Sequence, residues 1–317
     1  MTGRRLNLRM PAPLELPDGY TQRALAFEDA AAVTAVIAAQ ERHDVGEVMI
    51  EEADIVADWQ RPSYDVTQSS VGVVHGETLV AYAEIGGGDR GDAAVHPDHR
   101  GRGIGTALAH WMQGLARELG QPVVGMPVPG GSAGDRLLES LGYHVRWTSW
   151  VLELPEGATI PERPAPEGYT VRQATEADHQ AVWTVTEDAF LEWSDRERQT
   201  FEDWQARVSL RPGFEPWNLR VATDPTGEVV AISVVLLFRG ESTEGYVAQL
   251  ATRADQRGLG LAQALLADSF AVARAHGATR STLSTDSRTG ALGLYEKVGM
   301  KVFSTWVNRA IRTGPET

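Results

Sequence analysis

Two short stretches of the chain combine an arginine with closely spaced glycines, and both have the composition of an anion-binding loop. The first reads RGRGIG from Arg100, and the second reads RGLG from Arg257. Each one opens a run of residues with apolar side chains at helical spacing. The first amides of a helix have no partner within it, and glycines let the backbone approach an anion without a Cβ in the way. Both loops therefore predict binding of a phosphate or pyrophosphate group.

Other phosphate-binding motifs fit these loops less well. A dinucleotide-binding fold places its glycine loop after the first strand of a domain, with an acidic residue about 20 positions later. The phosphate loop of NTPases ends in Gly-Lys-Ser or Gly-Lys-Thr. Neither pattern is present, and the remaining alternative from the residues alone is a plain turn between a strand and a helix.

The two loops lie at matching places in an internal duplication. The phrases PDGYTQRAL from Pro17 and PEGYTVRQA from Pro166 precede them, and LGYHVRWTSW and VGMKVFSTW follow them. Three landmarks in the same order predict a repeat with a period of about 150 residues. The length of 317 residues also favours two domains. We expect domains at residues 1–155 and 168–317, joined by a proline-rich linker at 156–167.

Each copy has the pattern of a strand, one or two helices, further strands, the glycine loop, a long helix and a closing strand–helix–strand. In the second copy, residues 228–238 are a β-branched run of strand length, and residues 246–252 form a strand that leads into the loop. Residues 261–275 have helical spacing and end at His276-Gly277, as at a C-cap. This order predicts the α/β class with a mixed sheet.

These phrases also resemble a known family. VHPDHRGRGIGTAL and QRGLGLAQALL resemble the acetyl-CoA loop of GNAT N-acetyltransferases, and DSRTGALGLYEKVGM from Asp286 resembles the closing motif of that family. The likeness covers nearly the whole chain, twice. It implies two tandem GNAT domains, an arrangement similar to that of the mycothiol synthase group of the family.

The resemblance implies acetyl-CoA as co-substrate, with pantetheine along the strand before each loop and pyrophosphate on the loop. In the second copy the implied positions are Leu250, Ala251, Thr252, Arg257, Gly258, Leu259, Gly260, Leu261, Ala262 and Gln263. In the first copy they are Ala93, Ala94, Val95, Arg100, Gly101, Arg102, Gly103, Ile104, Gly105 and Thr106.

A tyrosine acid is implied in the second copy only. Tyr295 stands where the family keeps a tyrosine beside the sulfur, and a phenol can protonate a departing thiolate. The alternative is a core tyrosine. Aligning LLESLGY with LYEKVGM places Leu138 opposite Tyr295, and leucine has no proton to give. We therefore expect the first copy to bind acyl-CoA or support the fold without catalysing.

A base for the acceptor amine is expected on the strand before the second loop. We favour Glu244, with Tyr246 on the same face of the strand. Counting back from Arg257 puts the usual glutamate position nearer Tyr246, and a β-bulge would move this register by one residue. The alternative is that Glu244 is a solvated residue of a turn.

The segment from Phe190 to Trp217 is rich in aromatic and charged residues. We expect it to help build the acceptor pocket, with Trp193, Trp204 and Tyr246 as candidate substrate contacts. Glu192 or Asp203 would then meet an ammonium group. The alternative is that aromatic residues at helical spacing belong to the core.

Composition excludes several classes of function. A net charge of −14 and a pI near 5.0 disfavour nucleic acid and anionic membranes as partners and favour a cationic amine. The absence of cysteine removes disulfides, thiolate metal sites and thiol nucleophiles. No apolar stretch has the length of a membrane span. We expect a cytoplasmic monomer or homodimer with no metal, the His96 and His99 pair being a chance spacing.

Together these observations predict an acetyl-CoA-dependent N-acetyltransferase acting on a primary amine of a small molecule. A narrower alternative is acetylation of a cysteinyl amine, as in mycothiol synthase. The alternative of another class is a non-catalytic acyl-CoA-binding sensor or interaction module. Tyr295 with a nearby carboxylate discriminates between these classes, because a binding module needs neither.

Overall fold

The computed structural model of the chain describes residues 12–161, 163–240 and 242–314. These residues form two compact units, each described by itself. The first holds the described residues up to Thr148 and those from Trp306 onward, and the second runs from Ser149 to Thr305. This division differs from the expected contiguous domains, because the last strand of the chain belongs to the first unit.

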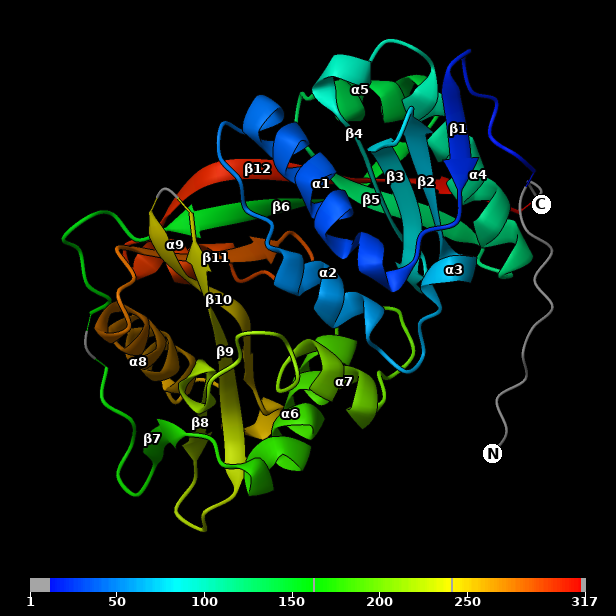
Figure 1. Cartoon of the computed structure of the whole chain (residues 1–317). Helices are drawn as coiled ribbons and strands as arrows, with labels where there is room; N and C mark the ends of the chain where they lie inside the picture. The colour runs from blue at the N-terminus through cyan, green and yellow to red at the C-terminus, as the bar shows by residue number, and fades with distance from the viewer. Residues whose placement is uncertain (1–11, 162, 241, 315–317) are drawn as a thin grey trace. The chain divides into compact units, whose positions relative to one another are not determined.

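The first unit is a six-stranded sheet covered by helices on both faces. Its strands, in sheet order, are β1 (Tyr20–Arg23), β2 (Ser70–His75), β3 (Thr78–Gly87), β4 (Arg90–Val95), β5 (Val123–Pro129) and the end of β12 (Lys301–Arg312) (Figure 1). Only β4 and β5 pair in parallel. The helical segments are η1 (Phe27–Asp29), α1 (Ala30–Asp44), α2 (Glu52–Trp59), α3 (Val66–Ser69), η2 (Pro97–His99), α4 (Ile104–Glu118) and α5 (Ala133–Ser140).

Two hydrophobic clusters hold these helices against the sheet. Val33 and Val36 of α1 and Trp59 of α2 pack on one side. Leu108 and Leu115 of α4 pack with the β2 and β3 side chains of the other cluster. Because successive strand residues point to opposite faces, the apolar run of β3 can serve both clusters.

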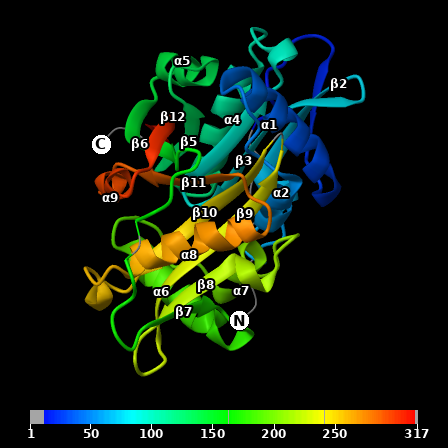
Figure 2. The same ribbon diagram turned by 90° about the vertical axis from the view of Figure 1, so that its left-hand side faces the viewer.

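The second unit repeats this plan. Its strands, in sheet order, are β7 (Thr170–Gln173), β8 (Leu219–Thr223), β9 (Val229–Arg239), β10 (Thr243–Thr252), β11 (Arg280–Asp286) and the end of β6 (His144–Glu153). Its helical segments are η3 (Glu176–Asp178), α6 (His179–Leu191), α7 (Phe201–Arg207), η4 (Pro216–Asn218), η5 (Ala254–Gln256), α8 (Leu261–Ala275) and α9 (Leu292–Lys297). Figure 2 shows α8 lying across β9 and β10. The predicted strand at 228–238 and helix at 261–275 are confirmed within one residue.

The duplication extends to individual hydrogen bonds. The Tyr20 amide donates to the Pro17 carbonyl at 3.2 Å, and the Tyr169 amide donates to the Pro166 carbonyl at 3.0 Å. After the first strand of each copy, an arginine pairs with an aspartate: Arg23 with Asp29 at 2.6 Å, and Arg172 with Asp178 at 2.7 Å. Matching contacts at matching places show that the two units are copies of one fold.

The two copies exchange their last strands. Residues Trp306–Arg312 of β12 pair antiparallel with β5 of the first unit. Residues 149–153 of β6 pair antiparallel with β11 of the second unit. Arg309 on β12 also donates from Nε to Asp135 at 2.7 Å in α5. Each sheet is therefore completed by a strand that follows the other copy in sequence.

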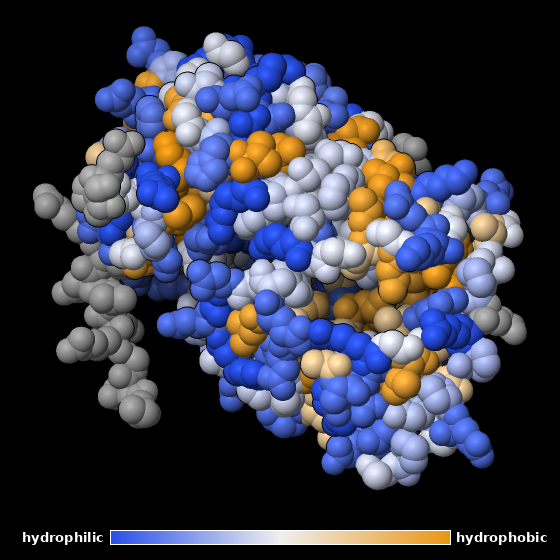
Figure 3. All heavy atoms as spheres, turned by 180° about the vertical axis from the view of Figure 1, so that it is seen from behind, coloured by the Kyte–Doolittle hydropathy of each residue, from blue (hydrophilic) through white to orange (hydrophobic). Residues whose placement is uncertain are grey.

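In the part of the chain that the structure describes, no helix combines the length and the apolar character needed to cross a membrane. On the face seen in Figure 3, hydrophilic side chains predominate and hydrophobic atoms show between them in separate groups.

Candidate active site

In both copies the sheet opens next to the glycine loop. The parallel pair β4 and β5 is in register only at Arg90 and Gly125. In the second copy, β10 pairs with β11 from Glu244 to Val247 and beyond that only with β9. A register shift between Val247 and Gln249 marks a β-bulge at this point. Beyond the bulge β10 stays paired with β9, and its other edge, which has lost β11, is left for another partner.

The glycine loops have the geometry of anion-binding helix starts. Gly103 and Gly260 are the N-cap residues of α4 and α8, with φ of +84° and +86°, a region that favours glycine. The first helical hydrogen bonds run from Ala107 to Gly103 and from Ala264 to Gly260. The three amides before each of these donors precede the helical ladder, so they can donate to an anion.

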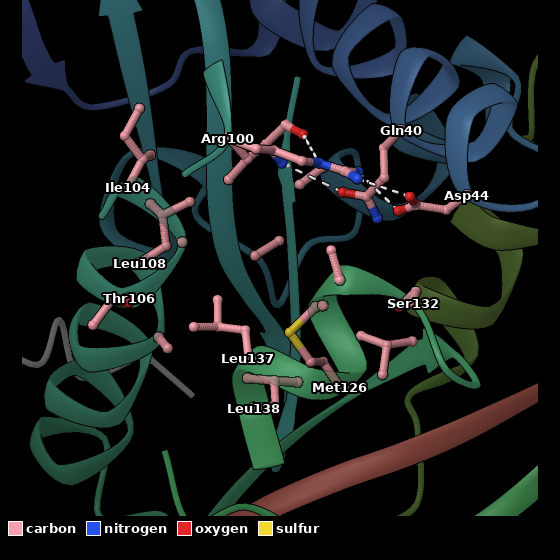
Figure 4. A pocket seen from close by; sticks show the side chains of 18 of the residues that line it. Gln40, Asp44, Arg100, Ile104, Thr106, Leu108, Met126, Ser132, Leu137 and Leu138 are labelled. Atoms are coloured by element: carbon pink, nitrogen blue, oxygen red, sulfur yellow. Dashed lines mark hydrogen bonds and ion pairs between the residues drawn. The ribbon is translucent and has the colours of Figure 1, made fainter. Parts of the chain in front are cut away.

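The first loop borders a cavity of about 390 Å³ (Figure 4). Of the predicted first-copy residues, all line it except Arg102; they are Ala93, Ala94, Val95, Arg100, Gly101, Gly103, Ile104, Gly105 and Thr106. Sequence reasoning missed the opposite wall, which includes Gln40 of α1, Met126 of β5 and Leu137 of α5. No local motif marks these residues, because the fold brings them to the loop from distant segments.

Each loop arginine forms an ion pair with a carboxylate at the end of a long helix, α1 in the first copy and α6 in the second. Arg100 pairs with Asp44 at 2.7 Å, and Arg257 pairs with Glu192 at 2.7 Å. Each Nε also donates to the strand before the loop, to the Val95 carbonyl at 3.3 Å and to the Thr252 carbonyl at 3.2 Å. These side chains therefore fasten the loop to its strand and helix. The expectation that Glu192 meets a substrate ammonium is corrected, since its carboxylate is engaged by Arg257.

Glu244 and Tyr246 lie on one face of β10, in the part that is still paired with β11 before the sheet opens. The Glu244 carboxylate accepts a hydrogen bond from the Thr282 hydroxyl and lies 3.9 Å from Arg280 Nη1. The Tyr246 hydroxyl lies 2.7 Å from the Ser284 hydroxyl. The Glu244 side chain is 14 % exposed, so it is a strand residue and not a solvated residue of a turn. Its surroundings are polar, which suits a group that accepts a proton.

Tyr295 lies on the buried side of α9, 9 % exposed. Burial, together with the charge of the Tyr246 phenol, raises the pKa of Tyr295 to about 12. The phenol therefore stays protonated over the whole neutral range. Full transfer of its proton to a thiolate of pKa near 8.5 is uphill by about 5 kcal/mol. The sequence suggested that Tyr295 protonates the thiolate. Its raised pKa instead favours a hydrogen bond from the phenol to the charge that develops on the sulfur.

In the first copy Leu138 holds the position of Tyr295. The Tyr143 amide donates to the Leu138 carbonyl at 3.0 Å, and the Met300 amide donates to the Tyr295 carbonyl at 3.1 Å. Leu138 is 3 % exposed and lines the first-copy cavity. This cavity has an apolar wall where the second copy has a phenol.

The candidate acceptor residues are separated by the structure. Trp204 is 1 % exposed and stacks on Phe201 in the core at a centroid distance of 5.7 Å, so it does not form a pocket wall. Trp193 is half-buried, with the Arg288 guanidinium 4.8 Å from its ring. Asp203 is buried near the start of α7, and its backbone amide donates to the Thr200 hydroxyl that caps this helix. Trp193 and Tyr246 remain as candidate contacts.

Two buried polar atoms on β10 test whether a pantetheine fits beside this strand. Among the described residues, Gln249 Oε1 and Thr252 Oγ1 have no hydrogen-bond partner. Buried polar groups normally have one. Both atoms belong to the part of β10 that has lost its β11 partner, where the amide-rich chain of a pantetheine could satisfy them. These residues fit such a group.

The described residues hold no cluster of three or more His, Asp or Glu side chains arranged to bind a metal ion. His96 and His99 pack with their rings 5.8 Å apart at their centroids, and His99 Nδ1 lies 2.8 Å from the Tyr20 hydroxyl.

Comparison with known proteins agrees with this geometry. The sequence pattern of the Acetyltransferase (GNAT) family matches residues 34–129 and 179–300. The chain belongs to the GNAT family, as a tandem acetyltransferase with one GNAT domain in each copy.

Within the family, several similar proteins carry one name. A mycothiol acetyltransferase of Salinispora arenicola is 30 % identical over 78 % of this chain and 81 % of its own length. A protein of the same name from Salinispora tropica is 32 % identical over 73 % of this chain and 77 % of its own length. The solved structure of a GCN5-related N-acetyltransferase from Sphaerobacter thermophilus superposes with a TM-score of 0.71, at 28 % identity over 95 % of this chain and 98 % of that chain. A tandem GNAT protein from the clavulanic acid biosynthesis pathway has a TM-score of 0.67 at 17 % identity, over 94 % of this chain and all of that chain, which shows the shared fold.

Proposed function

We propose that the second copy transfers the acetyl group of acetyl-CoA to the cysteinyl amine of a mycothiol precursor. The observation that carries the location is the proximity of Tyr246 to the buried Tyr295, with Glu244 on the same face of β10, the strand that leads to an anion-binding loop. The relatives named mycothiol acetyltransferase, which match across most of both copies, support the acceptor. The coarser statement, a primary amine of a small molecule, includes this acceptor.

The residues divide the work of the reaction. Acetyl-CoA supplies an activated carbonyl carbon, to which the amine nitrogen bonds as the carbon–sulfur bond breaks. Glu244 accepts the proton that the nitrogen loses, and Tyr295 donates a hydrogen bond to the departing sulfur, which leaves as the thiolate of CoA. Backbone amides of β10 beyond the bulge stabilise the negative charge on the carbonyl oxygen. The amides at the start of α8, between Gly258 and Gln263, hold the pyrophosphate.

The first copy has a different part in this proposal. We infer that its cavity binds acyl-CoA through Gly101, Gly103 and the first turn of α4 without turning it over. Leu138 has no proton to donate to a thiolate, and the cavity wall around it is apolar. Binding without chemistry would stabilise the first unit and leave catalysis to the second.

The test is an incubation of the protein with acetyl-CoA and a panel of amines that includes the cysteinyl precursor of mycothiol, an amino sugar and an amino acid. Product is detected by mass spectrometry, because a cysteinyl acceptor carries its own thiol and would disturb an assay of free thiol. The proposal expects acetylation of the cysteinyl amine with the highest kcat/KM. Preference for another amine would remove this acceptor, and binding of CoA with no product from any amine would favour the sensor alternative.

A further inference from the structure

Residues of the linker at 156–167 pack against the second copy. Ile160 is 6 % exposed and belongs to the same hydrophobic cluster as Leu266 and Phe270 of α8. The Gln263 amide Nε2 donates to the Pro161 carbonyl at 2.8 Å. Further along, Ala165 packs against the cluster that contains Leu261 and Leu265. The linker thus follows the first turns of the helix that opens at the second glycine loop.

One linker side chain lies on the loop itself. Arg163 Nη2 donates to the Gly258 carbonyl at 3.4 Å. A Cβ built at Gly260 would clash with Arg163 Nε and would meet its Cδ at 2.7 Å. The guanidinium therefore stands over the N-cap of α8, where a pyrophosphate on this loop would lie.

The electrostatics of this contact favour the binding of an anion. The start of a helix carries a partial positive charge, so a guanidinium there is repelled unless an anion lies between them. The other loop-region cations are held by carboxylates: Arg257 by Glu192, and Arg253 by Asp255 and Glu228. Among the described residues, the Arg163 guanidinium has one hydrogen bond, to a carbonyl, at the long end of the range. That bond costs little to exchange for a phosphate oxygen.

The first copy has no such arrangement. When the two copies are aligned with Pro17 opposite Pro166, Leu14 stands opposite Arg163. The Leu14 side chain packs against the core of the first unit. A Cβ at Gly103, the counterpart of Gly260, would meet no atom of the described residues within 4 Å. The linker arginine is therefore a feature of the second loop.

We propose that Arg163 is a pyrophosphate-binding residue of the second copy, contributed by the linker and paired with acyl-CoA when the cofactor lies on the Gly258–Gln263 loop. This inference rests on the proposed function, because it takes the second loop as a CoA site. A guanidinium and a phosphate form short, charge-assisted hydrogen bonds. The linker would then do more than join two domains, since it would supply the second loop with a cation; the first loop has Arg102 within it, where the second has Leu259.

The experiment measures CoA binding at one loop at a time. Amide hydrogen exchange is followed by mass spectrometry while CoA is titrated, and protection of peptides covering 253–266 reports the second copy. Arg163→Ala should raise the dissociation constant of CoA at this loop by about tenfold or more, because a hydrogen bond to a charged group is lost. It should also reduce the salt dependence of binding. Arg163→Lys should restore part of the affinity, and 3′-dephospho-CoA should show the same loss, because the contact is with the pyrophosphate.

The matched control is Arg274→Ala, which removes the same charge from an exposed position near the other end of α8, about 20 Å away along the helix. It should leave CoA binding unchanged. Unchanged affinity in Arg163→Ala would overturn the inference, and tighter binding would show that the arginine blocks the loop. If the wild-type chain shows no protection at 253–266 with saturating CoA, the proposed function itself has failed at this loop, which is a separate outcome.

Discussion

Tyr295 and Leu138 occupy the same place in two copies of one fold, each with its carbonyl accepting the same capping hydrogen bond at the end of a short helix. One side chain ends in a buried phenol and the other in two methyl groups. Both positions follow an intact anion-binding loop. We therefore attribute the expected difference in catalysis between the copies to the hydroxyl that one copy has at this position and the other lacks.

Replacing Tyr295 by phenylalanine removes the hydroxyl and keeps the ring that packs in the core. We expect kcat to fall by about 100-fold or more, the range for loss of one hydrogen-bond donor to a developing charge, with little change in the KM for acetyl-CoA. Steady-state kinetics on the preferred amine measures both. Tyr143→Phe removes a buried hydroxyl from the first copy and should keep full activity. Equal rates in wild type and Tyr295→Phe would take Tyr295 out of the mechanism.

Glu244→Gln keeps an oxygen that can accept from Thr282 and removes the ability to take up a proton. If Glu244 is the base, kcat/KM falls by about 100-fold and the limb of the pH–rate profile that reports the base disappears. Tyr246→Phe tests the rival assignment on the same strand face. A pH profile unchanged in Glu244→Gln and altered in Tyr246→Phe would move the assignment to Tyr246.

Glu84 predicts a pH dependence of stability in the first unit. It is 5 % exposed, and its Oε2 accepts from Trp59 Nε1 and the Tyr64 hydroxyl, both at 2.7 Å. Burial, with the nearby Asp92 charge, raises the pKa of Glu84 to about 7. The folded chain thus keeps a proton that the unfolded chain releases near pH 4.5. Stability from this group is complete at low pH and is lost as the pH rises from about 4.5 to 7.

Glu84→Gln mimics the protonated acid and keeps an oxygen for both donors. Relative to wild type, it should gain stability as the pH rises, by on the order of 3 kcal/mol at pH 8. Urea unfolding at a series of pH values from about 4 to about 8 measures this difference in the free energy of unfolding. Glu77→Gln, at an exposed turn between β2 and β3, is the control and should show no pH-dependent gain. Parallel pH curves for Glu84→Gln and wild type would show that Glu84 ionises normally.

The exchanged strands predict that the last residues of the chain stabilise the first unit. Ending the chain at Thr305 removes the β12 residues that pair with β5 and removes Arg309, which binds Asp135 and Glu139. Amide hydrogens of β5 should then exchange faster, because that strand becomes an edge and loses its ladder. Peptides from β8 and β9 of the second unit are the internal reference. Unchanged protection of β5 would contradict the exchange.

The repeat, the glycine loops and the helix after each loop could be predicted from the sequence, because these depend on local patterns of glycine, β-branched residues and helical spacing. It also placed Tyr295 opposite Leu138. The strand exchange could not be read, since β6 and β12 have the same kind of pattern and nothing local states which sheet each one joins. The wall formed by Gln40, Met126 and Leu137 was hidden for the same reason.

Two further differences have physical causes. Trp204 and Trp193 both lie in an aromatic-rich segment, and composition alone cannot tell a core tryptophan from one near a site. The linker at 156–167 contains three prolines, which favour an extended chain, yet its single isoleucine, Ile160, anchors it in the core. The contact of Arg163 with the loop follows from that anchor and from the direction in which the linker then runs.

In the proposed reaction the second loop serves catalysis and the first does not. Gly101 and Gly258 are counterparts with φ of +73° and +79° and open space at the Cβ position. Valine at either position strains the loop equally and puts a side chain where pyrophosphate would lie. The rate of acetylated product formation from acetyl-CoA and the preferred amine is the measurement. We expect near-complete loss of this rate in Gly258→Val and a rate close to wild type in Gly101→Val. The reverse pattern would show that the first loop serves catalysis.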